Sequence, residues 1–343
     1  MILARSFTAT ALAVLVVGAQ VNPQFKHQTS GTTVHLRGIS AVNSYIAWAS
    51  GNKGTFLRTT NGGQTWLSGS VPEASSLDFR DVEAIDAKTA YLLATAGKIY
   101  KTTDGGRRWS LQYNNMTPGV FLDSFAFWDA RHGIVLGDPI NDHFLLLTTS
   151  NGGLTWREVP STRLPAAITG EAAFAASGTC IAVEGKSNVW FATGGKAARV
   201  FRSTDRGRTW SVSNTPIISG EDSTGIFSIA FKDARNGCVV GGDYKKPIAA
   251  GNNAARTTDG GVTWKLVEQA RPNGFRSCVE YLGRTSTLIA VGERACDYST
   301  DGGASWKSLG TEGYHGTSFA PSRAGWAVGA DGRIAGITFT NSH

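Results

Sequence analysis

The chain has 343 residues, of which 41% are hydrophobic and only 17% charged, with 42 glycines and ten tryptophans. This composition excludes a disordered tail, a helical bundle and a coiled coil, and it favours short strands joined by tight turns. Lys and Arg exceed Asp and Glu by seven, an excess that bears on solubility and partners rather than on fold.

Residues 1–19 have the pattern of a signal peptide. Arg5 supplies the positive start, residues 7–17 an apolar stretch, and Val17-Gly18-Ala19 a small-residue cleavage site. The alternative is an uncleaved anchor, but the apolar stretch is too short to span a bilayer. We therefore expect export to the periplasm or medium, cleavage near Gln20, no stable membrane anchor, and one mature domain over residues 20–343.

An eight-residue motif repeats six times after this segment. Its copies are TTNGGQTW (59–66), TTDGGRRW (102–109), TSNGGLTW (149–156), STDRGRTW (203–210), TTDGGVTW (257–264) and STDGGASW (299–306). Successive tryptophans lie 43, 47, 54, 54 and 42 residues apart, close to the period of a four-stranded propeller blade. The repeat therefore predicts an all-β propeller.

Each motif has the residues of a tight hairpin. The Ser/Thr and the Asp/Asn two positions later can hydrogen-bond nearby backbone groups, and Gly supplies positive φ. Because these acids recur with the blades, we interpret them as structural rather than catalytic. Asn61 and Asn151 replace Asp, and Arg206 replaces the first Gly; we expect these departures to cost a little hairpin order and nothing in fold.

Seven apolar segments predict the second strands of seven blades. They are residues 46–49, 90–93, 133–136, 189–192, 237–240, 288–291 and 325–328. The seventh has no motif after it, and residues 333–339 fit the third strand of an unfinished blade. We expect residues 32–36 to supply the missing outer strand and close the ring between the two chain ends, which removes exposed sheet edges.

The motif S/T-x-D-x-G-x-T-W is the Asp-box, or bacterial neuraminidase repeat. Together with phrases such as WAVGADGRI and RDVEAID, over roughly residues 30–340, it resembles the photosystem II stability/assembly factor-like family of seven-bladed propellers. Sialidases, sortilin-type receptors and some endoglucanases share the box. The resemblance implies a seven-bladed propeller of four-stranded antiparallel blades and an assembly or binding role.

The innermost strands should line a central channel, and ligands of propellers usually bind at one mouth of it. We place these strands near residues 37–39, 80–82, 122–124, 227–229, 276–278 and 316–318, with blade four at either 172–176 or, the choice we favour, 180–183. Arg37, Arg80 and Arg276 then occupy equivalent positions in one sector, with His315 beside them. They form a candidate anion-binding patch. Alternatively, each Arg pairs with a local acid such as Asp81, Asp123 or Glu280.

Two long loops carry further polar residues, Asp243-Tyr244-Lys245 in blade five and Asp138 in blade three. Long loops on rigid scaffolds often bind ligands, although ordinary solvated polarity explains them equally. The candidate binding residues at the channel mouth are Arg37, Arg80, Asp123, Glu171, Asp243, Tyr244, Lys245, Arg276 and His315.

Catalytic chemistry finds less support. A sialidase-like hydrolase or lyase acting on an anionic sugar is the alternative function, because three arginines, Tyr244, Glu171, Glu184 and Asp243 could be recruited. The sialidase F/Y-R-I-P signature is absent, however, and no carboxylate pair stands at equivalent strand ends. We assign no catalytic residue.

The chain also has no G-x-G dinucleotide motif, P-loop or G-x-S-x-G elbow, and its six histidines lack metal-ligand spacing. We assign no cofactor and no metal. Basic residues are spread over all blades, so nucleic acid is not an expected partner.

Four cysteines, Cys180, Cys238, Cys278 and Cys296, can form disulfides in an exported chain or remain as buried thiols. The sequence thus predicts an exported, monomeric, non-enzymatic propeller that binds a protein or peptide partner, and that accepts an anionic ligand if the arginine patch forms.

Overall fold

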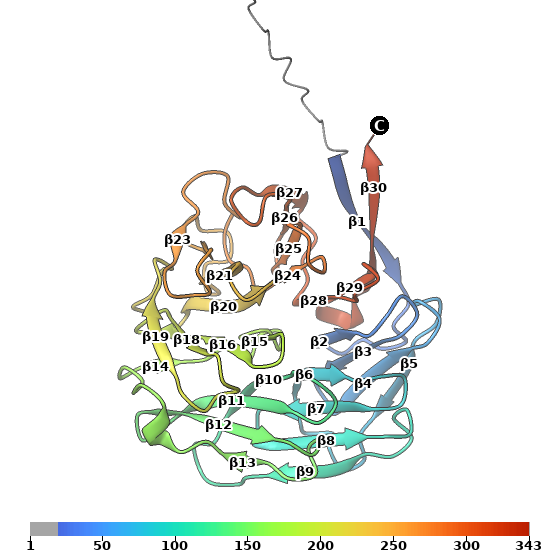
Figure 1. Ribbon diagram of the computed structural model, residues 1–343. Helices are drawn as coiled ribbons and strands as arrows, with labels where there is room; N and C mark the ends of the chain where they lie inside the picture. Colours follow the sequence, from blue (N-terminus) through green and yellow to red (C-terminus); the bar gives the residue numbers. More distant parts are fainter. Residues whose placement is uncertain (1–19, 343) are drawn as a thin grey trace, which may run out of the picture.

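The computed structural model describes residues 20–342, and the predicted signal peptide lies outside them. These residues contain thirty strands and two short 3-10 turns, η1 (Ser161–Arg163) and η2 (Ala330–Gly332). The strands form seven antiparallel sheets arranged around a central axis (Figure 1). The predicted seven-bladed all-β propeller is confirmed. Within residues 20–342 no helix is long and apolar enough to cross a membrane.

Each blade has four strands in chain order from the axis outward, except that the chain start completes blade seven. The blades are β2 (Leu36–Ala41), β3 (Ala47–Gly51), β4 (Thr55–Thr59), β5 (Leu67–Ser70); β6 (Phe79–Ala84), β7 (Ala90–Ala94), β8 (Lys98–Thr102), β9 (Ser110–Asn114); β10 (Leu122–Phe127), β11 (Gly133–Ile140), β12 (His143–Thr149), β13 (Arg157–Glu158); β15 (Ile181–Glu184), β16 (Asn188–Ala192), β18 (Arg199–Ser203), β19 (Ser211–Asn214); β20 (Thr224–Phe231), β21 (Gly237–Asp243), β22 (Ala254–Thr257), β23 (Lys265–Leu266); β24 (Cys278–Tyr281), β25 (Leu288–Val291), β26 (Cys296–Ser299), β27 (Lys307–Gly310); and β28 (Gly316–Phe319), β29 (Gly325–Val328), β30 (Ile334–Ser342), β1 (Gln20–Gln28).

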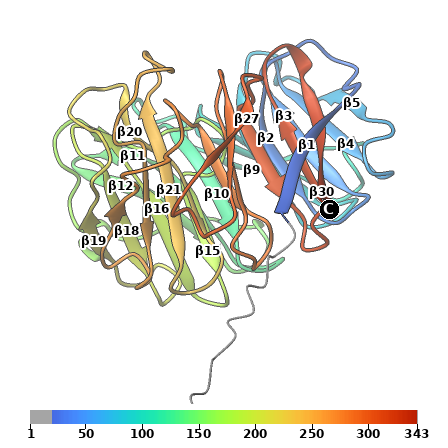
Figure 2. The same ribbon diagram turned by 90° about the horizontal axis from the view of Figure 1, so that it is seen from above.

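The ring closes between the two ends of the chain, as predicted, but through a different segment. β1 pairs antiparallel with β30 over its whole length, from Gln20 opposite Ser342 to Gln28 opposite Ile334, and the two strands lie side by side in Figures 1 and 2. The expectation that residues 32–36 form the outer strand is wrong. They instead lead into β2 at the axis, because the chain needs a connecting stretch to pass from the outer edge of blade seven to the inner edge of blade one.

The core lies between adjacent blades. Trp48 of β3 is fully buried against Phe79 and Leu92 of blade two, and its indole N–H donates to the Asp86 carbonyl, 3.0 Å away. The Asp-box tryptophans also pack between blades, as when Trp109 meets Trp48 edge-on. Burial of this apolar surface on both faces of each second strand holds neighbouring sheets together.

Each Asp-box joins the third and fourth strands of its blade. In box one, Thr59 Oγ1 accepts the amide of Gly63 (2.9 Å), and Asn61 Oδ1 accepts the amide of Thr65 (3.0 Å). In box five, Asp259 makes the corresponding bond to the amide of Thr263 at 3.0 Å. The Asn-containing box therefore keeps these hairpin bonds, and the small loss of hairpin order expected from the replacement is not seen in them.

The blades define two faces of the ring. Antiparallel strands alternate in direction, so the turn between strands three and four lies at the end of the blade opposite the start of strand one. We call the face at which the inner strands begin the entry face and the face with the Asp-boxes the box face. All nine candidate binding residues belong to inner-strand starts or loops of the entry face.

A short segment closes the channel on the entry-face side. In this plug, residues 174–179, Gly178 O accepts the Ser124 hydroxyl of blade three at 2.7 Å, and Ser177 Oγ donates to Ser277 O of blade six at 2.8 Å. Thr179 Oγ1 donates to Ser228 of blade five, 2.7 Å away. The favoured inner strand of blade four, 180–183, is confirmed as β15. Residues 171–172 form β14 (Glu171–Ala172), which with β17 (Gly194–Gly195) extends blade five.

Below the plug a cavity of about 860 Å³ reaches the box face, where Arg284 and Arg323 are exposed. The channel is therefore blind. The four cysteines are buried and unpaired, and burial raises the pKa of the Cys238 thiol to about 12 and that of Cys278 to about 11. The sequence left open whether these cysteines form disulfides or remain buried thiols, and in the structure they are buried thiols.

Candidate functional site

The Arg37 side chain forms no hydrogen bond or ion pair within residues 20–342. It lies in β2, directly before Gly38, where an added Cβ would approach Val82 N to 2.9 Å, so the backbone of blade one is pressed against blade two. Its Nε is buried without a hydrogen-bond partner among the described residues. Burial lowers the pKa of the Arg37 guanidinium, and the positive charge of Arg80 lowers it further. Binding of an anion would stabilise the charged form of this buried, unpaired guanidinium.

Arg80 stands beside Arg37 at the start of β6. Its Nε donates to Asp78 Oδ2 at 2.6 Å, and one Nη donates to the Ala175 carbonyl of the plug at 3.0 Å. Its side chain remains 29% exposed. Arg80 is thus oriented by its own acid and by the plug, and it keeps an accessible edge.

Arg276 does not join these two side chains. It is fully buried, with Nε donating to Asp297 Oδ2 at 2.6 Å and Nη1 to Phe275 O at 2.7 Å. The prediction that Arg276 joins Arg37 and Arg80 in a surface patch is therefore wrong. The partner of Arg276 comes from β26, the third strand of the same blade, and is none of the acids named as alternatives.

His315 adds no charge to the patch. Its ring is buried, with Nδ1 2.8 Å from the Leu36 carbonyl. Burial, followed by the positive charge of Arg37, lowers the pKa of His315 to about 4. The imidazole is therefore neutral at pH 7, and the expected cationic role is corrected.

Asp123 is buried rather than at the surface of the entry face. It is fully buried, and neither carboxylate oxygen has a hydrogen-bond partner among the described residues. Burial, reinforced by the charge of Asp138, raises the pKa of Asp123 well above its ordinary value. Asp138 itself accepts the amide of Ala173 at 2.9 Å and helps to anchor the plug.

Glu171 is also structural. Its Oε1 accepts Arg199 Nε at 2.9 Å and the Thr193 hydroxyl at 2.5 Å, in a buried ion pair that holds β14 against blades four and five. This arrangement fixes the chain just before the plug. Glu171 is unavailable to a ligand in this structure.

The blade-five loop remains exposed. Asp243 accepts the Lys245 amide at 3.0 Å and so shapes the turn, while Tyr244 is 45% exposed and meets Phe227 edge-on. Phe227 in turn stacks on Phe174 of the plug at 3.9 Å between ring centroids. Tyr244 and Lys245 therefore stand at the rim of the surface whose centre is formed by the plug.

The entry-face site thus contains Arg37 and Arg80 beside the plug, with Tyr244 and Lys245 on the rim. Reading the sequence missed the plug, and it missed Asp78 and Glu293, whose negative charges oppose the lowering of the Arg37 pKa. The signal for the plug was the 54-residue spacing between Trp156 and Trp210, longer than the first two intervals because it includes the crossing segment. The arginine triad that a sialidase-like hydrolase needs is not assembled in residues 20–342.

Comparisons with known proteins agree with this architecture. Residues 18–124 match the family described as "Photosynthesis system II assembly factor YCF48". A comparison with curated protein sequences gives no match.

Among solved structures, the chain is similar to "YCF48 bound to D1 peptide", with TM-score 0.66, 17% identity, and coverage of 91% of this chain and 96% of that one. It is also similar to "YCF48 from Cyanidioschyzon merolae", with TM-score 0.66, 16% identity, and coverage of 91% and 98%.

A GH74 enzyme from Niastella koreensis has TM-score 0.62 and 17% identity over 90% of this chain, which spans 53% of the enzyme. At these identities the structural matches show the fold. Together with the family match, they confirm the resemblance found from the sequence.

Proposed function

We propose that this chain, which resembles the YCF48 assembly factors, is an exported, non-enzymatic scaffold that binds a protein segment on its entry face. The observation that carries the proposal is Arg37, whose buried Nε has no hydrogen-bond partner in the described residues. A carboxylate of the bound segment, from a side chain or a chain terminus, is the group that this guanidinium fits best.

The surroundings of Arg37 suit a peptide better than a small molecule. The plug closes the channel at this face, so a ligand rests on the surface instead of entering the ring. Tyr244 offers an exposed aromatic ring at the rim, and aromatic residues with Arg are typical anchors of protein interfaces. The rigid β-scaffold holds these groups in place, which limits the entropy lost on binding.

Support also comes from the comparisons. One of the structures with a similar fold is of YCF48 with a D1 peptide bound to it, and a binding role of that kind fits the entry face described above. Export rests on the predicted signal peptide, and we place the scaffold in the periplasm or outside the cell.

The test is capture of envelope proteins by wild type and by the Arg37→Ala variant. Captured segments are identified by mass spectrometry and resynthesised with free and with amidated carboxyl groups. We expect the free acids to bind at least tenfold more tightly than the amides to wild type, a difference of about 1.4 kcal/mol, and this preference to vanish in Arg37→Ala.

Arg323→Ala, an exposed arginine on the box face, is the matched control and should bind as wild type does. Equal binding of acids and amides, or the same loss in both variants, contradicts the proposal.

A further inference from the structure

A second basic site lies on the opposite face, between blades three and four. Here a groove of about 450 Å³ runs between the Asp-box of blade three and that of blade four, with Trp128, Gly133 and Thr148 among the residues that line it. This volume falls within the range of small-molecule sites. The groove is separate from the entry face and does not depend on the function proposed for it.

The side chains that line the groove are strongly basic. They include four arginines and one histidine, against a single carboxylate, that of Glu158: Arg157, Arg163, Arg206, Arg208 and His132. Arg157, Arg163 and Arg208 are exposed and form no ion pair within the described residues. Their charges are therefore available to a ligand.

Arg206 gives an independent sign that the groove is specialised. It has φ +61°, the left-handed region that favours glycine, and each of the other five boxes has Gly at this position: Gly62, Gly105, Gly152, Gly260 and Gly302. Arg at this position costs conformational free energy that Gly would not. A backbone outlier of this kind is the sort of observation from which a functional role can be inferred.

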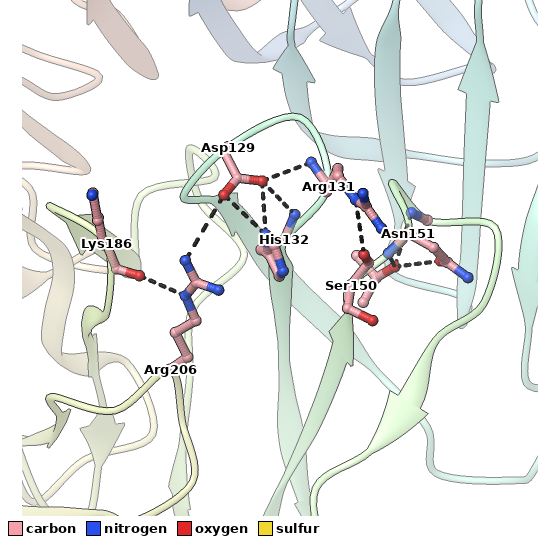
Figure 3. A network of polar contacts seen from close by, with 9 residues as sticks. Asp129, Arg131, His132, Ser150, Asn151, Lys186 and Arg206 are labelled. Carbon is pink, nitrogen blue, oxygen red and sulfur yellow. Dashed lines mark hydrogen bonds and ion pairs between the residues drawn. The ribbon is translucent and has the colours of Figure 1, made fainter.

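The neighbours of Arg206 hold its guanidinium in place. Its Nε donates to the Lys186 carbonyl at 2.5 Å, and one Nη lies 3.9 Å from Asp129 Oδ2. Figure 3 shows the guanidinium between these two residues.

Asp129 Oδ1 already accepts hydrogen bonds from the amides of Arg131 and His132, at 2.8 and 2.9 Å, and it also lies 2.9 Å from Nδ1 of the His132 ring. A guanidinium has five N–H donors, so these contacts leave several for an anion.

We propose that this inter-blade groove binds a small polyanion carrying phosphate or sulfate groups. Guanidinium groups match the tetrahedral oxyanion geometry and charge, and four of them around one groove favour a ligand with more than one anionic group. Arg206 sits at the blade-four wall, Arg157 and Arg163 follow the blade-three box, and Arg208 completes the basic lining.

The test is calorimetric titration of the full chain with inorganic tripolyphosphate and, separately, with a trisulfated disaccharide, at about 0.15 M salt to suppress unspecific charge effects. We expect saturable binding of at least one of them. Binding of only the first identifies a phosphate ligand, and binding of only the second identifies a sulfated sugar.

Arg206→Gly restores the residue that the other boxes have. It should weaken binding about tenfold or more, the loss expected for one charge-assisted contact, while the melting temperature stays equal or rises. Because this variant favours the fold, misfolding cannot account for the loss.

Arg208→Ala should likewise weaken binding, whereas Arg107→Ala, the same position in box two, should leave it unchanged. Absence of saturable binding of either probe, full binding by Arg206→Gly, or equal losses in Arg208→Ala and Arg107→Ala would overturn the proposal.

Discussion

Ser177 donates from its hydroxyl to the backbone carbonyl of Ser277, 2.8 Å away, although one hundred residues separate them in the chain. This bond attaches the plug, which lies just before the inner strand of blade four, to blade six. Ser277 in turn donates to the His315 carbonyl at 2.7 Å, which extends the connection to blade seven. The plug therefore links blades that share no sheet, and it converts a through-channel into a blind cavity beneath the entry face.

Gly178 is where the plug allows no side chain. It has φ +75°, and an added Cβ would lie 2.1 Å from Asp81 Oδ1, the carboxylate that also accepts the Val82 amide at 2.7 Å. Gly178→Ala should lower the free energy of unfolding by about 2–4 kcal/mol, from positive φ plus the disturbed buried hydrogen bonds. Denaturant unfolding measures this loss.

Gly283→Ala is the control, because Gly283 also has positive φ but no atom lies within 4 Å of the added Cβ. It should cost only about 1 kcal/mol. Equal losses in the two variants would show that the plug is not tightly packed against Asp81.

The buried pair of Arg276 and Asp297 should affect stability and not binding. Arg276→Met removes one partner and leaves Asp297 buried and uncompensated, which should cost about 3–5 kcal/mol. The double variant Arg276→Met/Asp297→Leu should recover most of that loss. Thermal unfolding of the three proteins tests the pair, and recovery by less than half would argue against it.

Two of the three carboxyl groups that line the cavity, those of Glu83 and Glu280, make stability depend strongly on pH. Burial raises the pKa of Glu83 to about 8, with help from the charges of Asp81 and Glu280, and burial raises that of Glu280 to about 8. The native state therefore binds these protons more tightly than the unfolded chain, in which Glu has a pKa near 4.3. Their contribution to stability is complete below that value and is lost as the pH rises toward and through 8.

The double variant Glu83→Gln/Glu280→Gln should remove the part of this dependence that comes from the two glutamates, while Asp81, whose pKa burial raises to about 7, keeps its own part. Its melting temperature should exceed that of wild type at pH 9 and approach it at pH 4, as differential scanning calorimetry can measure. Glu158→Gln, which changes an exposed carboxylate of blade three, is the control and should follow wild type. A wild-type melting temperature that does not fall relative to the double variant between pH 5 and 9 would contradict the assignment.

The Asp-box acid should tolerate Asn and not Ala. Asp259 accepts the amides of Val262 and Thr263 at 3.1 and 3.0 Å, bonds that an amide oxygen can also accept, as Asn61 does in box one. Asp259→Asn should therefore change the free energy of unfolding by less than about 0.5 kcal/mol, whereas Asp259→Ala should lower it by about 1–2 kcal/mol, comparable to the loss of a helix cap. Urea unfolding of both variants compares the losses, and indistinguishable values would contradict the hairpin assignment.

Local pattern predicted the repeating part of this molecule well. The six boxes, the seven second strands and the inner strands lie where the sequence placed them, because hairpin bonds and strand burial depend on residues close together in the chain. The outer strand of blade seven was misplaced, since Gln20–Gln28 pairs with a strand more than three hundred residues away and carries no local sign of that partner.

The amino-acid order alone determined the circular stack of blades and the face on which the inner strands begin. Only the tertiary structure decided which polar residues reach solvent. His315 occupies the position equivalent to Arg37, yet its ring is buried against the Leu36 carbonyl. Arg276 lies one residue earlier, at the position of the buried Leu36 and Tyr314, and pairs there with Asp297. The physical reason is that periodicity assigns a side chain to a face of a sheet, whereas its charge state and accessibility depend on partners supplied by distant strands and by the plug.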